Sequence, residues 1–469
     1  MSEKREEEVH VVMLPWLAFG HMIPFLDLSI ELAKSNIHVS FLSTPRNIQR
    51  LPQIPPNLIP FIDFVPLPLE YSGGLLPEYA EATIDITVDR MNDLKIASDL
   101  LRQPIKDFMA EKLPDWIVVD FFPYWIVDIA RDLSIPIISH CVFAAAAAAF
   151  FWSPEFLSGE GRRSARPSPE DFTAPPDWFD FLSEVALSKH EAKAMHHVLY
   201  DVNSSGIADG DRLTRLLQAS AAVSIRTCTD FEPDYLGLYS KLTGKPVIPI
   251  GLLPPETPPD RPPPRQEAAI FNWLDRQKPR SAVFVGFGSE TKLNREHIHE
   301  IAHGLELSGV PFLWAMRKPD NEALPAGFLQ RTAEQGVVHL GWAPQREILG
   351  HPSIGGSLFH GGWGSIIETL QYGHALVLLP FVFDQPLNTK LMVEKGLGVE
   401  VERDGEDGSF TRNDVASALK KGMVSDVELR ARCRKAGREI FGNQDLHRAY
   451  VEKFVRFLKG PQTITSHAK

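Results

Sequence analysis

The chain has 469 residues, of which 44% are hydrophobic and 23% charged, and its formal net charge is −12. This length favours two domains, because single hydrophobic cores stop growing near about 250–300 residues. The negative charge argues against nucleic acid or an anionic membrane as the main partner, since no global basic field exists to attract either. The three cysteines are widely spaced and form no CxxC pair, which indicates a reducing compartment rather than a disulfide framework or a zinc ribbon.

The N-terminal half alternates short apolar runs with helical stretches. Residues 9–14 predict a buried strand, followed by a glycine-containing turn and an amphipathic helix over 23–35. Further strands are predicted at 39–43, 116–119 and 137–139. Continuous apolar strands between helices are typical of a parallel sheet that is covered on both faces.

No targeting segment is predicted. The first residues, MSEKREEEVH, are charged and largely acidic, unlike a signal or transit peptide. The longest apolar run, 141–152, has 12 residues, whereas a membrane span needs about 20. We interpret this run as a buried helix and expect a cytoplasmic protein without stable membrane insertion.

Eight prolines lie between Pro249 and Pro264, in PIGLLPPETPPDRPPP. Such a stretch continues neither a helix nor a central strand, so it marks the predicted domain boundary. Strand–helix alternation then restarts, with strands predicted at 283–286, 312–315, 337–340, 357–360 and 376–380.

The expected fold class is therefore α/β, with two Rossmann-like domains facing across a cleft. The predicted units are an N-terminal domain (1–248), a linker (249–266), a C-terminal domain (267–445) and a helical end (446–469) that packs back onto the first domain. Ligands of such sheets bind at the carboxyl ends of the strands.

Four short patterns suggest other chemistries, and we interpret each as structural. His299-Glu300-Ile301-Ala302-His303 matches HExxH but lacks a third metal ligand. Asp209-Gly210-Asp211 matches DxD in a polar, turn-like stretch, and the acidic run 402–407 is expected to be a solvated loop. His360-Gly361-Gly362 is similar to an esterase oxyanion loop, yet the chain has no GxSxG nucleophile. No metal site is predicted.

Residues 342–385 read WAPQREILGHPSIGGSLFHGGWGSIIETLQYGHALVLLPFVFDQ. This segment resembles the donor-binding signature of plant family-1 UDP-glycosyltransferases in length, order and spacing. The resemblance includes WLDRQKPRSAVFVGFGSE at 273–290 and extends over essentially the whole chain. It implies the GT-B architecture, with the acceptor bound by the N-terminal domain, a UDP-sugar bound by the C-terminal domain, and no metal or other cofactor.

The resemblance also assigns roles within the donor site. An aromatic ring can stack on uracil, an amide can bond a base edge, and a glycine-rich turn that opens a helix presents N–H groups and a positive dipole end to the diphosphate. Further side chains bond the phosphates, the ribose and the sugar hydroxyls. The residues so assigned are Ser289, Trp342, Gln345, His360, Trp363, Gly364, Ser365, Glu368, Asp384 and Gln385.

The expected catalytic pair lies in the N-terminal domain. His21 is predicted in the turn after the first strand, where a neutral imidazole can remove the proton of an acceptor hydroxyl. Asp120 follows strand 116–119 and would orient His21 and stabilise its imidazolium form. The family to which the chain is similar uses such a His–Asp pair in a single, inverting displacement. A capping histidine and a strand-end aspartate are the alternative interpretations of these two residues.

The sequence departs from the usual HCGWNS of that family. It has HGGWGS, with Gly361 for Cys and Gly364 for Asn, and Ala375 replaces a usual Pro. The Asn amide normally helps to hold the donor. These departures resemble the branch-forming subgroup, which implies a flavonoid or terpenoid glycoside as the acceptor.

Several alternatives stay open from the sequence. The donor sugar is glucose or rhamnose, with Gln385 more usual for glucose. The expected partners are a UDP-sugar and a small hydrophobic glycoside, and the protein is expected to be a monomer. The competing interpretations are direct transfer to an aglycone and a non-catalytic protein that binds nucleotide-sugars or glycosides.

Overall fold

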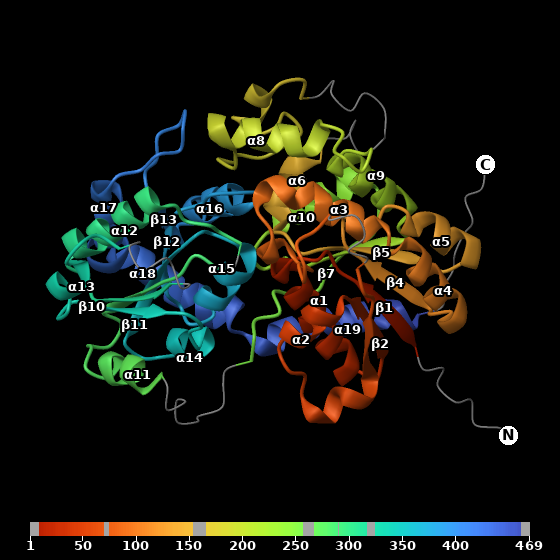
Figure 1. Cartoon of the computed structure of the whole chain (residues 1–469), viewed down its shortest axis with the longest axis horizontal. Helices are drawn as coiled ribbons and strands as arrows, with labels where there is room; N and C mark the ends of the chain where they lie inside the picture. Colours follow the sequence, from red (N-terminus) through yellow and green to blue (C-terminus); the bar gives the residue numbers. More distant parts are fainter. Residues whose placement is uncertain are drawn as a thin grey trace.

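The computed structural model describes residues 9–69, 75–152, 166–256, 267–288, 290–316 and 324–460. Their strands form two parallel sheets. The seven-stranded sheet has the order β3-β2-β1-β4-β5-β6-β7, and the six-stranded sheet has the order β10-β9-β8-β11-β12-β13. Figure 1 shows the two sheets in separate halves of the molecule, each flanked by helices. The predicted architecture of two Rossmann-like α/β domains is therefore confirmed.

Strands in the interior of the first sheet are buried along almost their whole length, as the apolar runs predict, whereas the two edge strands are only partly buried. They are β1 (His10–Leu14), β2 (His38–Ser43), β3 (Ile62–Pro66), β4 (Trp116–Val119), β5 (Ile137–Cys141), β6 (Ala222–Ile225) and β7 (Val247–Pro249). The helices of this half are α1 (Phe19–Lys34), α2 (Pro45–Arg50), α3 (Met91–Asp99), α4 (Arg102–Lys112), α5 (Ile126–Leu133), α6 (Ala145–Phe151), α8 (Lys189–Tyr200), α9 (Asp209–Ala219) and α10 (Pro233–Thr243).

The second sheet repeats the same alternation. Its strands are β8 (Ala282–Val285), β9 (Phe312–Met316), β10 (Gly336–Leu340), β11 (Ile354–Phe359), β12 (Ala375–Leu378) and β13 (Gly398–Glu400). Its helices are α11 (Ala268–Leu274), α12 (Arg295–Ser308), α13 (Phe328–Arg331), α14 (Gln345–Leu349), α15 (Trp363–Leu370), α16 (Gln385–Glu394), α17 (Arg412–Lys420) and α18 (Val427–Ala436). Between the two sets, the chain is described through residue 256 and again from 267, so most of the predicted linker lies outside the described residues.

Two predicted elements differ from the structure. Helix α1 begins at Phe19, four residues before the predicted start, because the N–H groups of His21 and Met22 both bond to the carbonyl of Ala18. The apolar run 141–152 is not one helix, since Cys141 still belongs to β5 and α6 begins at Ala145. Apolarity alone predicts burial but does not separate a strand end from the following helix.

The last helix, α19 (Gln444–Lys459), returns to the first half, where Figure 1 shows it beside α1. Its buried residues recur at helical spacing, at positions 447, 450, 451, 454, 455 and 458. Phe454 belongs to the same hydrophobic cluster as Val11 of β1 and Phe25 of α1, and the indole N–H of Trp116 donates to the carbonyl of Leu458 at 3.1 Å. Within the described residues, no helix has the length and apolarity that a membrane crossing needs.

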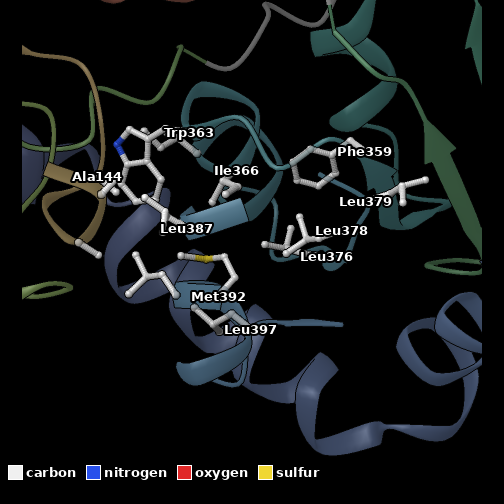
Figure 2. Packing of buried hydrophobic residues seen from close by; sticks show 14 of the residues in the cluster. Ala144, Phe359, Trp363, Ile366, Leu376, Leu378, Leu379, Leu387, Met392 and Leu397 are labelled. Carbon is white, nitrogen blue, oxygen red and sulfur yellow. The ribbon is translucent and has the colours of Figure 1, made fainter. Parts of the chain in front are cut away.

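A hydrophobic cluster continues across the boundary between the halves. It contains the alanines of α6 from the first half together with Trp363, Leu387 and Met392 from the second. Figure 2 shows Ala144 close to Trp363 and Leu387. Burial of apolar surface thus helps to hold the two halves together.

Candidate active site

His21 and Asp120 meet at the carboxyl ends of two neighbouring strands. Because β1 pairs with β4, the segments that follow these strands lie side by side. His21 is in the first turn of α1, and its Nδ1 lies 2.8 Å from Oδ2 of Asp120. The same carboxylate accepts hydrogen bonds from the backbone N–H of Trp16 at 3.0 Å and of Phe121 at 2.7 Å. These two backbone hydrogen bonds hold the carboxylate of Asp120 in place. The carboxylate in turn orients the imidazole of His21.

The surroundings of His21 act on its pKa in opposite directions. Burial lowers the pKa, but the charge and hydrogen bond of Asp120 outweigh it, with further contributions from the charges of Asp384 and Glu290, so the pKa is raised. The rings of Phe121 and Phe143 flank the imidazole, each with its centroid 5.6 Å away. With Nδ1 engaged by Asp120, Nε2 is the nitrogen available to a substrate proton.

In the second half, the turn after β11 opens helix α15. Gly362 is the N-cap and Trp363, Gly364 and Ser365 are the first residues of the helix. Backbone N–H groups in the first turn of a helix have no intrahelical acceptor, and they carry the positive end of the helix dipole. This end of α15 is therefore suited to an anion.

His360 lies directly before that turn, between two glycines. A Cβ atom on Gly288 would come within 2.7 Å of its ring and one on Gly362 within 2.6 Å. Burial lowers the pKa of His360 to about 4, which keeps the ring neutral, and its Nδ1 is buried without a hydrogen-bond partner. Such an atom costs about 1–3 kcal/mol until a ligand satisfies it.

Gly361 has a backbone conformation that favours glycine. Its φ is +80°, and an added Cβ would lie 2.8 Å from Oγ1 of Thr389 and 3.2 Å from the carbonyl oxygen of Gln385. The left-handed backbone conformation of Gly361 favours glycine over the usual Cys. The residues of α16 also leave little room for a side chain at this position.

The residues predicted to bind the nucleoside lie on α14 and α15 or beside them. Trp342 is 89% exposed, which leaves a bare aromatic face. Gln345 donates from Nε2 to Oε2 of Glu368 at 2.8 Å, so the structure brings these two together. Burial raises the pKa of Glu368, against the opposing charges of Arg346 and Arg226.

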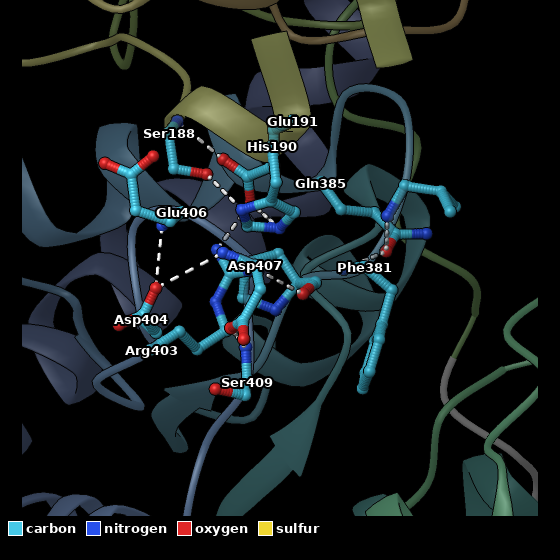
Figure 3. Close-up of polar contacts among 12 residues, drawn as sticks. Ser188, His190, Glu191, Phe381, Gln385, Arg403, Asp404, Glu406, Asp407 and Ser409 are labelled. Carbon is cyan, nitrogen blue, oxygen red and sulfur yellow. Dashed lines mark hydrogen bonds and ion pairs between the residues drawn. The ribbon is translucent and has the colours of Figure 1, made fainter. Parts of the chain in front are cut away.

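Asp384 and Gln385 stand at the start of α16. Gln385 accepts backbone hydrogen bonds at its side-chain oxygen from Phe381 at 3.0 Å and Val382 at 3.1 Å, which shapes the loop seen in Figure 3. Its amide N–H groups remain as the donors that it can offer to a ligand. Asp384 accepts from Nδ2 of Asn388 at 2.8 Å, and burial raises the pKa of Asp384.

The remaining predicted donor residues include Trp363, whose side chain is packed between the halves, and Ser289. The Trp363 side chain is 3% exposed, and its indole N–H donates to the carbonyl of Arg226 in the first half at 2.8 Å. Its ring also stacks on Phe231, so only its backbone N–H is left for a ligand. Ser289 lies outside the described residues.

The HExxH and DxD patterns occupy structural positions. The carboxylate of Glu300 accepts from the Nε and backbone N–H of Arg412, and no group of three metal-ligating side chains occurs in the described ranges. Asp209 is not in a turn but begins α9, where it pairs with Lys95 at 2.5 Å.

The acidic run 402–407 is a solvated loop, as expected, and all its residues except Arg403 are exposed. Arg403 is 7% exposed at its side chain and pairs with Glu191 of α8 in the first half at 2.5 Å, as Figure 3 shows. It also donates from Nη1 to the carbonyl of Pro380 at 3.0 Å. Sequence reasoning missed this contact because its two sides are far apart in the chain.

The Asp120→Asn variant tests what raises the pKa of His21. Without the carboxylate charge of Asp120, burial outweighs the remaining charges of Asp384 and Glu290, so the pKa of His21 should fall. The imidazolium, which persists above the ordinary pKa in the native protein, should then lose its proton at a lower pH. Titration followed by NMR of the imidazole protons measures this shift, and an unchanged midpoint contradicts the assignment.

Gly362→Ala tests the cradle of His360. The added methyl group forces the ring to move, so affinity for UDP, the donor nucleotide that the resemblance implies, should fall by about tenfold, the loss of one hydrogen bond. Gly237→Ala is the matched control, because a Cβ there meets nothing within 4 Å. Calorimetry with UDP gives both values, and equal affinities would show that the ring position is irrelevant.

The chain is similar in sequence to known sugar-transferring enzymes. A family model described as UDP-glucoronosyl and UDP-glucosyl transferase matches residues 267–428. The chain is 41% identical to UDP-glycosyltransferase 91C1 of Arabidopsis thaliana, covering 99% of this chain and 100% of that protein. It is 33% identical to the anthocyanidin-3-O-glucoside rhamnosyltransferase of Petunia hybrida, covering 96% of each.

A solved structure shares the fold. The crystal structure of Arabidopsis thaliana UGT89C1 complexed with UDP-L-rhamnose matches with a TM-score of 0.74 at 24% identity, covering 97% of this chain and 100% of that chain. The family inferred from residues 342–385 is thus confirmed. The chain belongs to the plant family-1 UDP-glycosyltransferases, a family with branch-forming members, and is an enzyme that transfers sugar from a UDP-sugar to plant natural products.

Proposed function

We propose that this enzyme moves glucose or rhamnose from UDP to a sugar hydroxyl of a flavonoid or terpenoid glycoside, with inversion at the anomeric carbon and with His21 as the base. The observation that carries the proposal is the His21–Asp120 pair at 2.8 Å, on which the charge of Asp384 acts from the opposite half. The proposed base and the carboxylate proposed to bind the sugar thus come from different halves of the molecule.

The reaction is a single displacement. The acceptor oxygen forms a bond to the anomeric carbon as the bond from that carbon to the UDP oxygen breaks. The hydroxyl proton passes to Nε2 of His21, and Asp120 stabilises the imidazolium through Nδ1. UDP leaves as an anion, so an α-linked glucosyl donor gives a β-linked product.

The leaving diphosphate is stabilised by the N-terminus of α15 and by the neutral His360, without a metal or other cofactor. In the proposed site, Trp342 stacks on the uracil, and the Gln345–Glu368 pair bonds the base edge and the ribose. The remaining donor contacts come from Ser289, the backbone N–H groups of Trp363 and Gly364, Ser365, Asp384 and Gln385.

The acceptor part of the proposal rests on two observations. The Petunia hybrida relative is named for a glucoside acceptor and a rhamnosyl donor. Beside His21, the rings of Phe121 and Phe143 offer an apolar wall for a flat or fused ring system. Direct transfer to an aglycone is the second candidate, because the same wall would accept a ring system without a sugar.

The proposal also places the enzyme in the cytoplasm as a monomer. Its cysteines Cys141, Cys228 and Cys433 are all free and buried, which suits a compartment that keeps thiols reduced.

His21→Ala should lower kcat by about 10²–10⁴-fold, the usual contribution of a general base. Affinity for UDP should stay near the native value, because His21 is not among the proposed diphosphate contacts. His303→Ala is the control with native turnover, because His303 is partly exposed on α12 and faces Glu306 of the same helix. Unchanged turnover in His21→Ala removes this residue from the mechanism.

A substrate panel tests the acceptor and the donor sugar. UDP-glucose and UDP-rhamnose are each offered with flavonoid and terpenoid aglycones and with their monoglucosides, and the products are solved by NMR. The expected product carries a new sugar–sugar bond with inverted anomeric configuration. Products glycosylated only on aglycone hydroxyls contradict the glycoside acceptor, and a retained configuration contradicts the single displacement.

A further inference from the structure

An arginine from the first half reaches the place where the family's usual Asn side chain would begin. A Cβ atom on Gly364, the second residue of α15, would lie 3.6 Å from Nη1 of Arg226. That distance is ordinary van der Waals contact. The space that a side chain at position 364 would occupy therefore lies next to the guanidinium of Arg226. Arg226 directly follows β6, and its carbonyl accepts the indole N–H of Trp363 from the second half at 2.8 Å.

Backbone carbonyls hold this guanidinium in a defined direction. Its Nε donates to the carbonyl of Leu252 at 2.8 Å and its Nη2 to that of Leu253 at 3.1 Å. Leu253 has a φ of +49°, a costly conformation for leucine, which turns successive carbonyls toward the arginine. Nη1 makes no hydrogen bond to any part of the chain that the structure describes.

The charge of Arg226 is only loosely neutralised by protein groups. Its side chain is 4% exposed and forms an ion pair with Asp27, in which Oδ2 lies 3.6 Å from Nη2, just beyond hydrogen-bond distance. Glu368 acts on it only through its charge. A buried guanidinium with an unused N–H edge is suited to an anion, and its planar fork matches phosphate oxygens.

We infer that Arg226 donates from Nη1 to the diphosphate of the bound UDP-sugar and replaces the amide that Gly364 lacks. This inference deepens the proposed function and rests on its donor site. It adds a contact from the acceptor-binding half to a donor otherwise held by the other half. Bound nucleotide would then join the two domains directly.

The test uses the full chain and UDP alone. Arg226→Met should weaken the calorimetric Kd for UDP by about 10- to 100-fold, the range of a charge-assisted hydrogen bond. Adding Gly364→Asn to that variant should recover at least about a third of the lost binding free energy for UDP. The reason is that the amide of the new Asn can donate to the same diphosphate.

Arg212→Met is the matched control. Arg212 is equally buried in the first half but pairs with Asp99, so its loss should lower the melting temperature and leave the Kd for UDP unchanged. Where Arg226→Met is too unstable to titrate, Arg226→Lys takes its place, with an expected loss of several-fold because the fork is absent.

A native Kd in the Arg226 variants overturns the inference, as does a loss that Gly364→Asn fails to restore. Because the Kd is measured without acceptor or turnover, this result is separate from that of the substrate panel. A failed panel with a weakened Kd would refute the proposed acceptor and keep the role of Arg226.

Discussion

The hydrogen bond from the Trp363 indole to the carbonyl of Arg226 fixes the relation between the two halves. His21 and its carboxylate partner belong to the first sheet, whereas Asp384 belongs to the loop after β12 of the second. A small rotation between the sheets would separate them. A buried tryptophan contributes about 3–5 kcal/mol, and Trp363 adds this contribution at the start of α15. The buried pair of Arg403 and Glu191 is a second connection between the halves.

Burial acts on two histidines of the same cleft with opposite outcomes. His360 has no carboxylate beside it, so burial alone lowers its pKa to about 4 and keeps it neutral. His21 is also buried, but Asp120 more than offsets that effect and raises its pKa. One ring can thus donate a hydrogen bond to an anion without carrying charge, while the other is a stronger base. The difference comes from one partner, placed by the pairing of β1 with β4.

Much of the fold could be predicted because its signals are local. The run 116–119 is the strand β4 without change, and the strands β8 to β12 of the second half agree with the predicted runs to within a few residues. The strands that the sequence did not predict are β3, β6, β7 and β13. Of these, β7 and β13 have three residues each, too few for a periodic pattern, and β3 is only partly buried. The start of α1 was predicted late, since it depends on backbone bonds to Ala18 rather than on side-chain periodicity.

The sequence by itself determined the residue types and spacing of the site: a histidine after the first strand, an aspartate after β4, and the donor segment from Trp342 to Gln385. These are local properties, and the parallel α/β pattern places them at strand ends. Only the tertiary structure decided which side chains remain available to a ligand. Trp363 is taken up by packing, and Arg226, which no motif marks, comes to lie beside Gly364. The physical reason is that such contacts join residues more than a hundred positions apart, and only the packing of the two sheets brings them together.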